Sequence, residues 1–151
     1  MQKNDLPESL DFLLANICHL HHARAHQLLE ALGLYRGQPP VLRALWEREG
    51  LTQTELAERM KITPATMTKM LQRMEKAGFI QRKVDAEDQR ISRVYLTEAG
   101  NMVQKDVEAV FRLTEEETFG NFTIEEQVLL RRFLLQMREN LLTATGEQPW
   151  K

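Results

Sequence analysis

The sequence has one cysteine, few aromatic residues and no long apolar run, and each shortage narrows what the chain can be. Cys18 alone cannot form an intrachain disulfide, so we expect a cytoplasmic setting, where thiols stay reduced. No stretch approaches the roughly 20 apolar residues of a membrane span. Asp5, Glu8 and Asp11 interrupt the N-terminal segment before a signal-peptide core can form. These shortages predict a protein that has no membrane partner.

Motifs that carry enzymatic chemistry are also missing. The chain has no glycine-rich phosphate loop, no nucleophile elbow, no HExxH pair and no paired cysteines. We therefore expect neither an enzyme nor a bound cofactor. Its 151 residues suit one domain with helical extensions, and the low aromatic content favours helices over a sandwich or barrel.

Charge is distributed unevenly along the chain. The net charge is −2, but residues 51–97 carry nine basic and six acidic side chains, a local excess of +3. The flanking segments are acidic, with net charges of −1 over 1–50 and −4 over 98–151. A basic centre between acidic flanks indicates a surface for a polyanion.

Apolar spacing and capping signals predict four helices, a hairpin and two further helices. Thr52 with Glu55, and Thr123 with Glu126, have the form of capping boxes. The segments FIQRKV and ISRVYL flank the polar DAEDQR and predict the hairpin. The predicted helices cover residues 9–32, 39–50, 53–60, 64–77, 98–119 and 124–144.

The helix that begins at Pro64, after the N-cap Thr63, has two contrasting faces. Its apolar face carries Met67, Met70, Leu71 and Met74 at helical spacing. The remaining surface carries Ala65, Thr66, Thr68, Lys69, Gln72, Arg73 and Lys76, and none of these is an acid. Two short helices with a tight turn and such a polar face predict a helix-turn-helix, and the following hairpin predicts a winged one.

Residues 51–100 resemble the winged helix-turn-helix of the MarR family of bacterial transcriptional regulators. The resemblance lies in LAERM, TPATMTKMLQRMEKAGFI, the DxR of Asp88 to Arg90, and YLTEAG. It implies a mainly α fold with a two-stranded β-hairpin wing and with N- and C-terminal helices that form a dimerisation domain. The implied parts are a dimerisation region at 1–36 and 120–151, and a DNA-binding domain at 37–119 with a reading helix at 64–77, a wing at 79–97 and a connecting helix at 98–119.

The resemblance also implies a homodimer that regulates transcription by binding a near-palindromic double-stranded DNA operator. In the family's usual mode it would be a repressor released by a small-molecule effector. The residues implied to bind DNA are Thr52, Gln53, Thr63, Ala65, Thr66, Thr68, Lys69, Gln72, Arg73, Lys83, Asp88 and Arg90.

Within the wing, the resemblance places Arg90 in the minor groove, and Asp88 would orient its guanidinium through a bidentate pair. Arg82 and Lys83 are expected to touch phosphates. Arg93 lies on the second strand and fits either a phosphate contact or a scaffold role, and the sequence leaves both open.

An effector that is aromatic or anionic would meet cationic and aromatic groups in a cleft beside the dimer helices. The residues proposed for that cleft are His19, His22, Arg24, Tyr35, Arg36 and Trp46.

Three alternatives stay open beside an effector-controlled regulator. The histidine cluster from His19 to His26 allows metal sensing, since His22 and His26 are four residues apart on one helix face. Cys18 allows redox sensing, although its apolar neighbours favour a buried, inert thiol. A winged helix that binds only other proteins is the third alternative, which the acid-free outer face of the helix at 64–77 disfavours.

Overall fold

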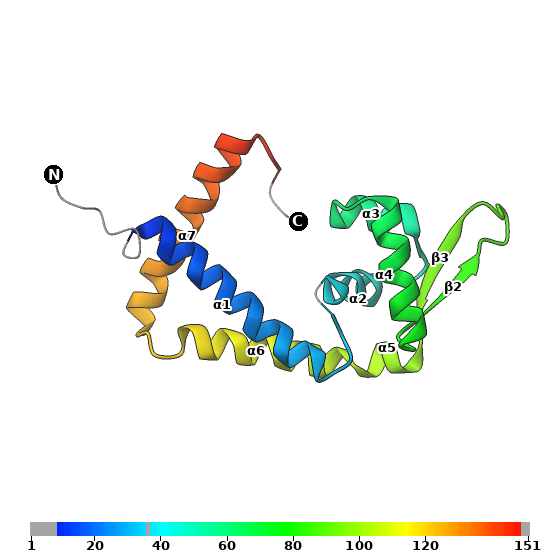
Figure 1. Cartoon of the computed structure of the whole chain (residues 1–151), viewed down its shortest axis with the longest axis horizontal. Helices are drawn as coiled ribbons and strands as arrows, with labels where there is room; N and C mark the ends of the chain where they lie inside the picture. The colour runs from blue at the N-terminus through cyan, green and yellow to red at the C-terminus, as the bar shows by residue number, and fades with distance from the viewer. Residues whose placement is uncertain (1–8, 36, 149–151) are drawn as a thin grey trace. The chain divides into compact units, whose positions relative to one another are not determined.

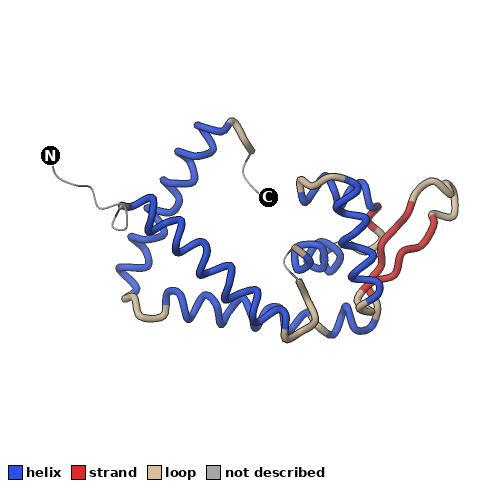
Figure 2. Tube along the Cα trace, viewed as in Figure 1, coloured by secondary structure: helices blue, strands red, loops and turns tan. Residues whose placement is uncertain are grey.

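The computed structural model describes residues 9–35 and 37–148 and divides the chain into two compact units. The first unit is Met1–Thr114 and the second is Glu115–Lys151. Figure 1 labels the helices and the strands β2 and β3, and Figure 2 separates helices from strands. The fold is mainly helical with one small antiparallel sheet, as the sequence predicts.

The first two helices begin where their local signals place them. α1 (Leu10–Glu30) follows Ser9, whose Oγ accepts a hydrogen bond from the Phe12 N–H at 3.1 Å. Gly33 ends this segment in the left-handed region at φ +75°, which glycine adopts without steric cost. α2 (Gln38–Glu47) has its two prolines in the first turn, where a missing N–H is tolerated.

Side-chain caps start the next two helices, α3 (Gln53–Met60) and α4 (Pro64–Lys76). Thr52 Oγ1 accepts the Glu55 N–H at 3.1 Å, and Glu55 Oε2 accepts the Thr52 N–H at 2.8 Å. The predicted capping box is thus confirmed, and the hydrogen bond from the Thr52 backbone lowers the pKa of Glu55. Thr63 caps α4 in the predicted way, since its hydroxyl accepts the Thr66 N–H at 3.2 Å.

The hairpin consists of β2 (Ile80–Val84) and β3 (Ser92–Leu96), with Ile80 opposite Leu96. A third strand, β1 (Leu51–Thr52), pairs with β3 and gives the sheet order β1-β3-β2. Sequence reasoning missed β1 because two residues cannot show alternation, and because Thr52 already served as a cap.

The prediction of one continuous helix over 98–119 is wrong, because the observed helix is interrupted at Val103. The structure has α5 (Glu98–Met102) and then α6 (Gln104–Phe119). At the interruption, the carbonyl of Gly100 accepts a hydrogen bond from Trp46 Nε1 at 2.9 Å. A side chain 54 residues away, which the local pattern cannot reveal, thus occupies a carbonyl of the first helical turn.

The packing around Gly100 explains why the segment YLTEAG ends in glycine. A Cβ built at this position would lie 2.1 Å from the Phe79 carbonyl oxygen, closer than real Cβ contacts allow. The missing side chain therefore lets α5 pack directly against the backbone that leads into β2.

The second unit contains α7 (Ile124–Thr145). Its predicted capping box is confirmed, because Thr123 Oγ1 accepts the Glu126 N–H at 3.2 Å and Glu126 Oε2 accepts the Thr123 N–H at 2.8 Å. No residue of α7 is buried within the single chain, although the helix is rich in leucine.

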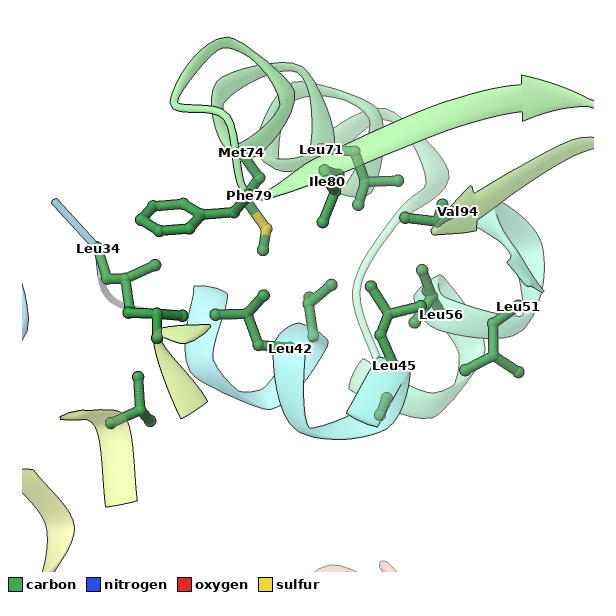
Figure 3. Packing of buried hydrophobic residues seen from close by; sticks show 14 of the residues in the cluster. Leu34, Leu42, Leu45, Leu51, Leu56, Leu71, Met74, Phe79, Ile80 and Val94 are labelled. Atoms are coloured by element: carbon green, nitrogen blue, oxygen red, sulfur yellow. The ribbon is translucent and has the colours of Figure 1, made fainter. Parts of the chain in front are cut away.

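The core lies in the first unit and holds the winged region together. Figure 3 shows Leu42 and Leu45 of α2 facing side chains from α4 and the hairpin, among them Met74, Ile80 and Val94. These five side chains are almost completely buried. Their burial fixes α4 and the start of the hairpin on one scaffold.

Among the helices of the described residues, none is long and apolar enough to cross a membrane.

Candidate nucleic-acid interface

α3, the turn at 61–63 and α4 form a helix-turn-helix. The inner face of α4 is anchored by Met67, Leu71 and Met74, whose side chains are completely buried. Gln53 at the start of α3 donates from Nε2 to Thr68 Oγ1 of α4 at 3.3 Å. The orientation of α4 is therefore set by the core on one side and by α3 on another.

The opposite face of α4 is open to solvent. Its exposed side chains are Ala65, Thr66, Lys69, Gln72, Arg73 and Lys76. Thr68, which is also predicted to face DNA, is less open because it is half-buried. Its hydroxyl donates a hydrogen bond to the Pro64 carbonyl at 3.0 Å. Thr63, also exposed, bonds the Thr66 hydroxyl at 2.8 Å. The face thus presents cations, an amide and hydroxyl groups on a rigid helix.

Glu75 is the only acid in α4, and it turns toward the hairpin instead of the open face. Its Oε1 lies 3.1 Å from Arg82 Nη2, and its Oε2 accepts the Arg82 N–H at 2.8 Å. These hydrogen bonds from Arg82 lower the pKa of Glu75. Arg82 is therefore engaged in holding β2 to the end of α4, whereas the sequence suggested a phosphate contact.

The wing consists of β2, β3 and the loop at 85–91. Asp88 Oδ1 accepts both the Arg90 N–H at 3.0 Å and Arg90 Nε at 3.3 Å. The predicted pairing of the two side chains is present, but the bidentate geometry is wrong, because the contact uses one guanidinium nitrogen and one carboxylate oxygen. The Arg90 side chain stays 92% exposed at the tip, so its remaining donors face solvent.

The sequence left two roles open for Arg93, a phosphate contact and a scaffold role, and the structure gives it the scaffold role. Its Nε donates to Asp85 Oδ1 at 2.9 Å, and its Nη1 donates to the Gly50 carbonyl at 2.9 Å. The hydrogen bond between the two side chains lowers the pKa of Asp85 and raises that of Arg93. Sequence reasoning missed Asp85, although its position as the first residue of DAEDQR, eight residues before Arg93, was a usable signal.

The other residues predicted to bind DNA differ in exposure and in the contacts that their side chains make. Lys83 is exposed on β2, and its Nζ lies 5.3 Å from the centroid of the Tyr95 ring. Thr52 and Gln53 are half-buried, and both use their side chains to hold α3 in place. Lys83 is thus available at the surface, while Thr52 and Gln53 act first on the fold.

Of the six residues predicted for an effector cleft, one lines the cavity described next. Trp46 lines a cavity of about 200 Å³ between α2 and α6. His19, His22, Arg24 and Tyr35 do not line it, and Arg36 lies outside the described residues. The other lining residues are Pro39, Arg43, Glu47, Gln104, Val107, Glu108 and Phe111.

The structure also places the two features considered as alternative sensors, Cys18 and the histidine cluster. Cys18 is exposed in the single chain, so the expectation of a buried thiol is wrong for the protomer. The reason is that α1 has apolar residues on several sides and buries only Leu29 within its own chain. In the described part of the chain, no group of three or more histidine, cysteine, aspartate or glutamate side chains could hold a metal ion.

In this chain a helix-turn-helix, whose second helix packs one face into the core, is followed directly by a hairpin. This arrangement defines the winged helix-turn-helix class of proteins. The model of the MarR family matches residues 34–92. The transcriptional regulator HosA of Escherichia coli is 35% identical over 118 residues, which cover 78% of this chain and 85% of HosA. The chain therefore belongs to the MarR family of transcriptional regulators, as its sequence resemblance implied.

Solved structures agree with this assignment. A MarR-like transcription regulator from Bacillus cereus ATCC 10987 is 29% identical with a TM-score of 0.75, over 87% of this chain and 95% of that one. The S. aureus MepR–DNA complex is 26% identical with a TM-score of 0.70, over 92% of this chain and 99% of MepR.

Proposed function

We propose that this chain is a sequence-specific regulator that reads double-stranded DNA with the open face of α4. The observation that carries the proposal is the exposure of Lys69, Gln72 and Arg73 on a helix whose other face is locked in the core. A helix fits the major groove of B-DNA, which is about 12 Å wide. There, arginine and lysine pair with guanine or with phosphate, and glutamine pairs with adenine.

The wing supplies a second contact at the adjacent minor groove. Arg90 is exposed at its tip, and a narrow minor groove attracts arginine through its negative potential. Lys83 on β2 is placed to meet phosphates along the flank of the wing. The helix would supply base readout, and the wing would supply backbone and shape readout.

A homodimer completes the proposal. α1 and α7 expose large apolar side chains in the single chain, with Leu10 at 86%, Ile17 at 54% and Phe133 at 50% exposure. A helix that is apolar on many sides and unburied in its own chain needs a partner surface. A second copy is the partner we propose, and a two-fold dimer would present two reading helices to one near-palindromic operator.

Control by a small molecule is the finer part of the proposal. The cavity between α2 and α6 has room for a ligand about the size of one substituted aromatic ring, and it places Trp46 and Phe111 beside the cation of Arg43. The Arg43 guanidinium carbon lies 5.6 Å from the centroid of the Phe111 ring. Because Glu47 and Glu108 also line the cavity, an aromatic effector fits it better than an anionic one. An aromatic effector bound there would touch the helix that leads into the core beneath α4, and we propose that it releases a repressor from its operator.

Binding measured over a salt series tests this function. A dimer that makes at least four phosphate contacts should show log K falling with log salt at a slope of about −3.6 or steeper, since each contact contributes about −0.9. The measurement uses the intact protein and DNA fragments selected by it from genomic DNA. A protein-interaction module would bind no duplex selectively, and a slope near zero would contradict the proposed contacts.

A further inference from the structure

A chain of hydrogen bonds runs through the wing from the sheet to its tip. Arg93 on β3 binds the Gly50 carbonyl, which precedes β1, and also binds Asp85 Oδ1, in both cases at 2.9 Å. The side chains of Arg93 and Asp85 are only 32% and 18% exposed. The base of the wing is therefore tied to the scaffold by a partly shielded ion pair.

The second oxygen of Asp85 continues the chain into the loop. Asp85 Oδ2 accepts the Asp88 N–H at 3.3 Å, and the Asp85 N–H donates to the Ile91 carbonyl at 2.9 Å. Asp88 in turn accepts both the N–H and Nε of Arg90 through one oxygen. Each link fixes the next, so the exposed guanidinium of Arg90 is joined to the sheet through Asp88, Asp85 and Arg93.

We propose that Asp85 and Arg93 are positioning residues for Arg90, which do not contact DNA themselves but set where the wing tip meets the minor groove. This inference rests on the proposed DNA-binding function. An arginine on an unbraced loop must be ordered when it binds, and that ordering opposes affinity. A loop already held in one conformation avoids most of this loss, so bracing at Asp85 acts on binding at a distance.

The sign of a charge effect separates this role from simple electrostatics. Asp85 is an anion in an element that approaches a polyanion, so removal of its charge alone should strengthen DNA binding. Loss of positioning should weaken it. Asp85→Asn keeps the shape of the side chain and removes the charge that pairs with Arg93, and we expect DNA affinity to fall about tenfold, the equivalent of one charge-assisted hydrogen bond.

Glu87→Gln is the matched control, because Glu87 is an exposed acid in the same loop. We expect it to leave affinity unchanged or to increase it. An Asp85→Asn protein that binds as tightly as Glu87→Gln, or more tightly than the wild type, would overturn the proposal.

A double-mutant cycle with Arg90→Ala identifies the route of the effect. If Asp85 acts through Arg90, Asp85→Asn should weaken binding in the wild-type background and change little when Arg90 is absent. The preference for A·T over G·C pairs at the wing position should fall with it, which a general loss of stability would not cause. An equal loss in both backgrounds would refute a positioning role.

Thermal unfolding and a second variant, Arg93→Gln, complete the test. Thermal unfolding checks that Asp85→Asn is folded, and Arg93→Gln, which keeps a donor for the Gly50 carbonyl, should show the same dependence on Arg90. Wild-type protein that binds no duplex selectively would sink the proposed function together with this inference. Normal wild-type binding with an additive cycle would sink the inference alone.

Discussion

Replacing Phe133 on α7 with glutamate is expected to dissociate the proposed dimer and to lower operator affinity by about 100-fold or more. Phe133 is the bulkiest apolar side chain of α7 and is half exposed in the single chain. In the proposed interface, a carboxylate at that position would be taken out of water, at a cost of several kcal/mol. Each released protomer would then bind one half-site, without the gain of about 10² to 10⁴ that linked binding gives.

Sedimentation and DNA titration check the two halves of this expectation together. Thr143→Glu adds the same charge on the same helix at a position that is already polar and exposed, and it should leave both the mass and the affinity unchanged. A Phe133→Glu protein that stays dimeric would move the proposed interface away from this part of α7.

Replacing Arg90 with alanine is expected to produce the second large loss. Hydrogen bonds to charged groups contribute about 1.5–3 kcal/mol each, so the removal of one from each of two wings should cost roughly 3–6 kcal/mol of operator binding. The side chain is 92% exposed and forms its ion pair with the exposed-loop residue Asp88, so the free energy of unfolding should hardly change. Fluorescence titration of the operator, together with thermal unfolding, measures both quantities.

Arg112→Ala removes the same charge from an exposed position on α6 and serves as the control. It should lower affinity far less than Arg90→Ala does. Equal losses in the two variants would mean that overall charge, and not insertion of the wing tip, governs binding.

The fold could be predicted wherever local signals decide it. The capping box at Thr52 and Glu55, the N-cap at Thr63 and the hairpin around DAEDQR all lie in short stretches whose chemistry permits one conformation. The strand β1 could not be predicted, because it depends on pairing with the distant β3. The hydrogen bond from Trp46 to the Gly100 carbonyl, close to the interruption at Val103, likewise joins distant segments and has no local signal.

The candidate interface follows the same division. Helical spacing was enough to place Lys69, Gln72 and Arg73 on the open face of α4, because the apolar residues leave only one side for them. The sequence did not show that Arg82 is engaged by Glu75, and it could not decide between the two roles of Arg93. The partners of both arginines are fixed only after the hairpin folds back on α4 and on β1. Periodicity identifies which face is open, but it does not say which cations are already engaged.

The most direct test of the central claim, that the open face of α4 reads base edges, is a profile of binding to every single-base variant of the selected operator. The wild type, Gln72→Ala and Arg73→Ala are compared in parallel. We predict that each variant loses about 1–3 kcal/mol of discrimination at one or two positions in each half-site and keeps the wild-type preferences elsewhere. A uniform fall in affinity with an unchanged profile would contradict the claim and would make these residues backbone contacts.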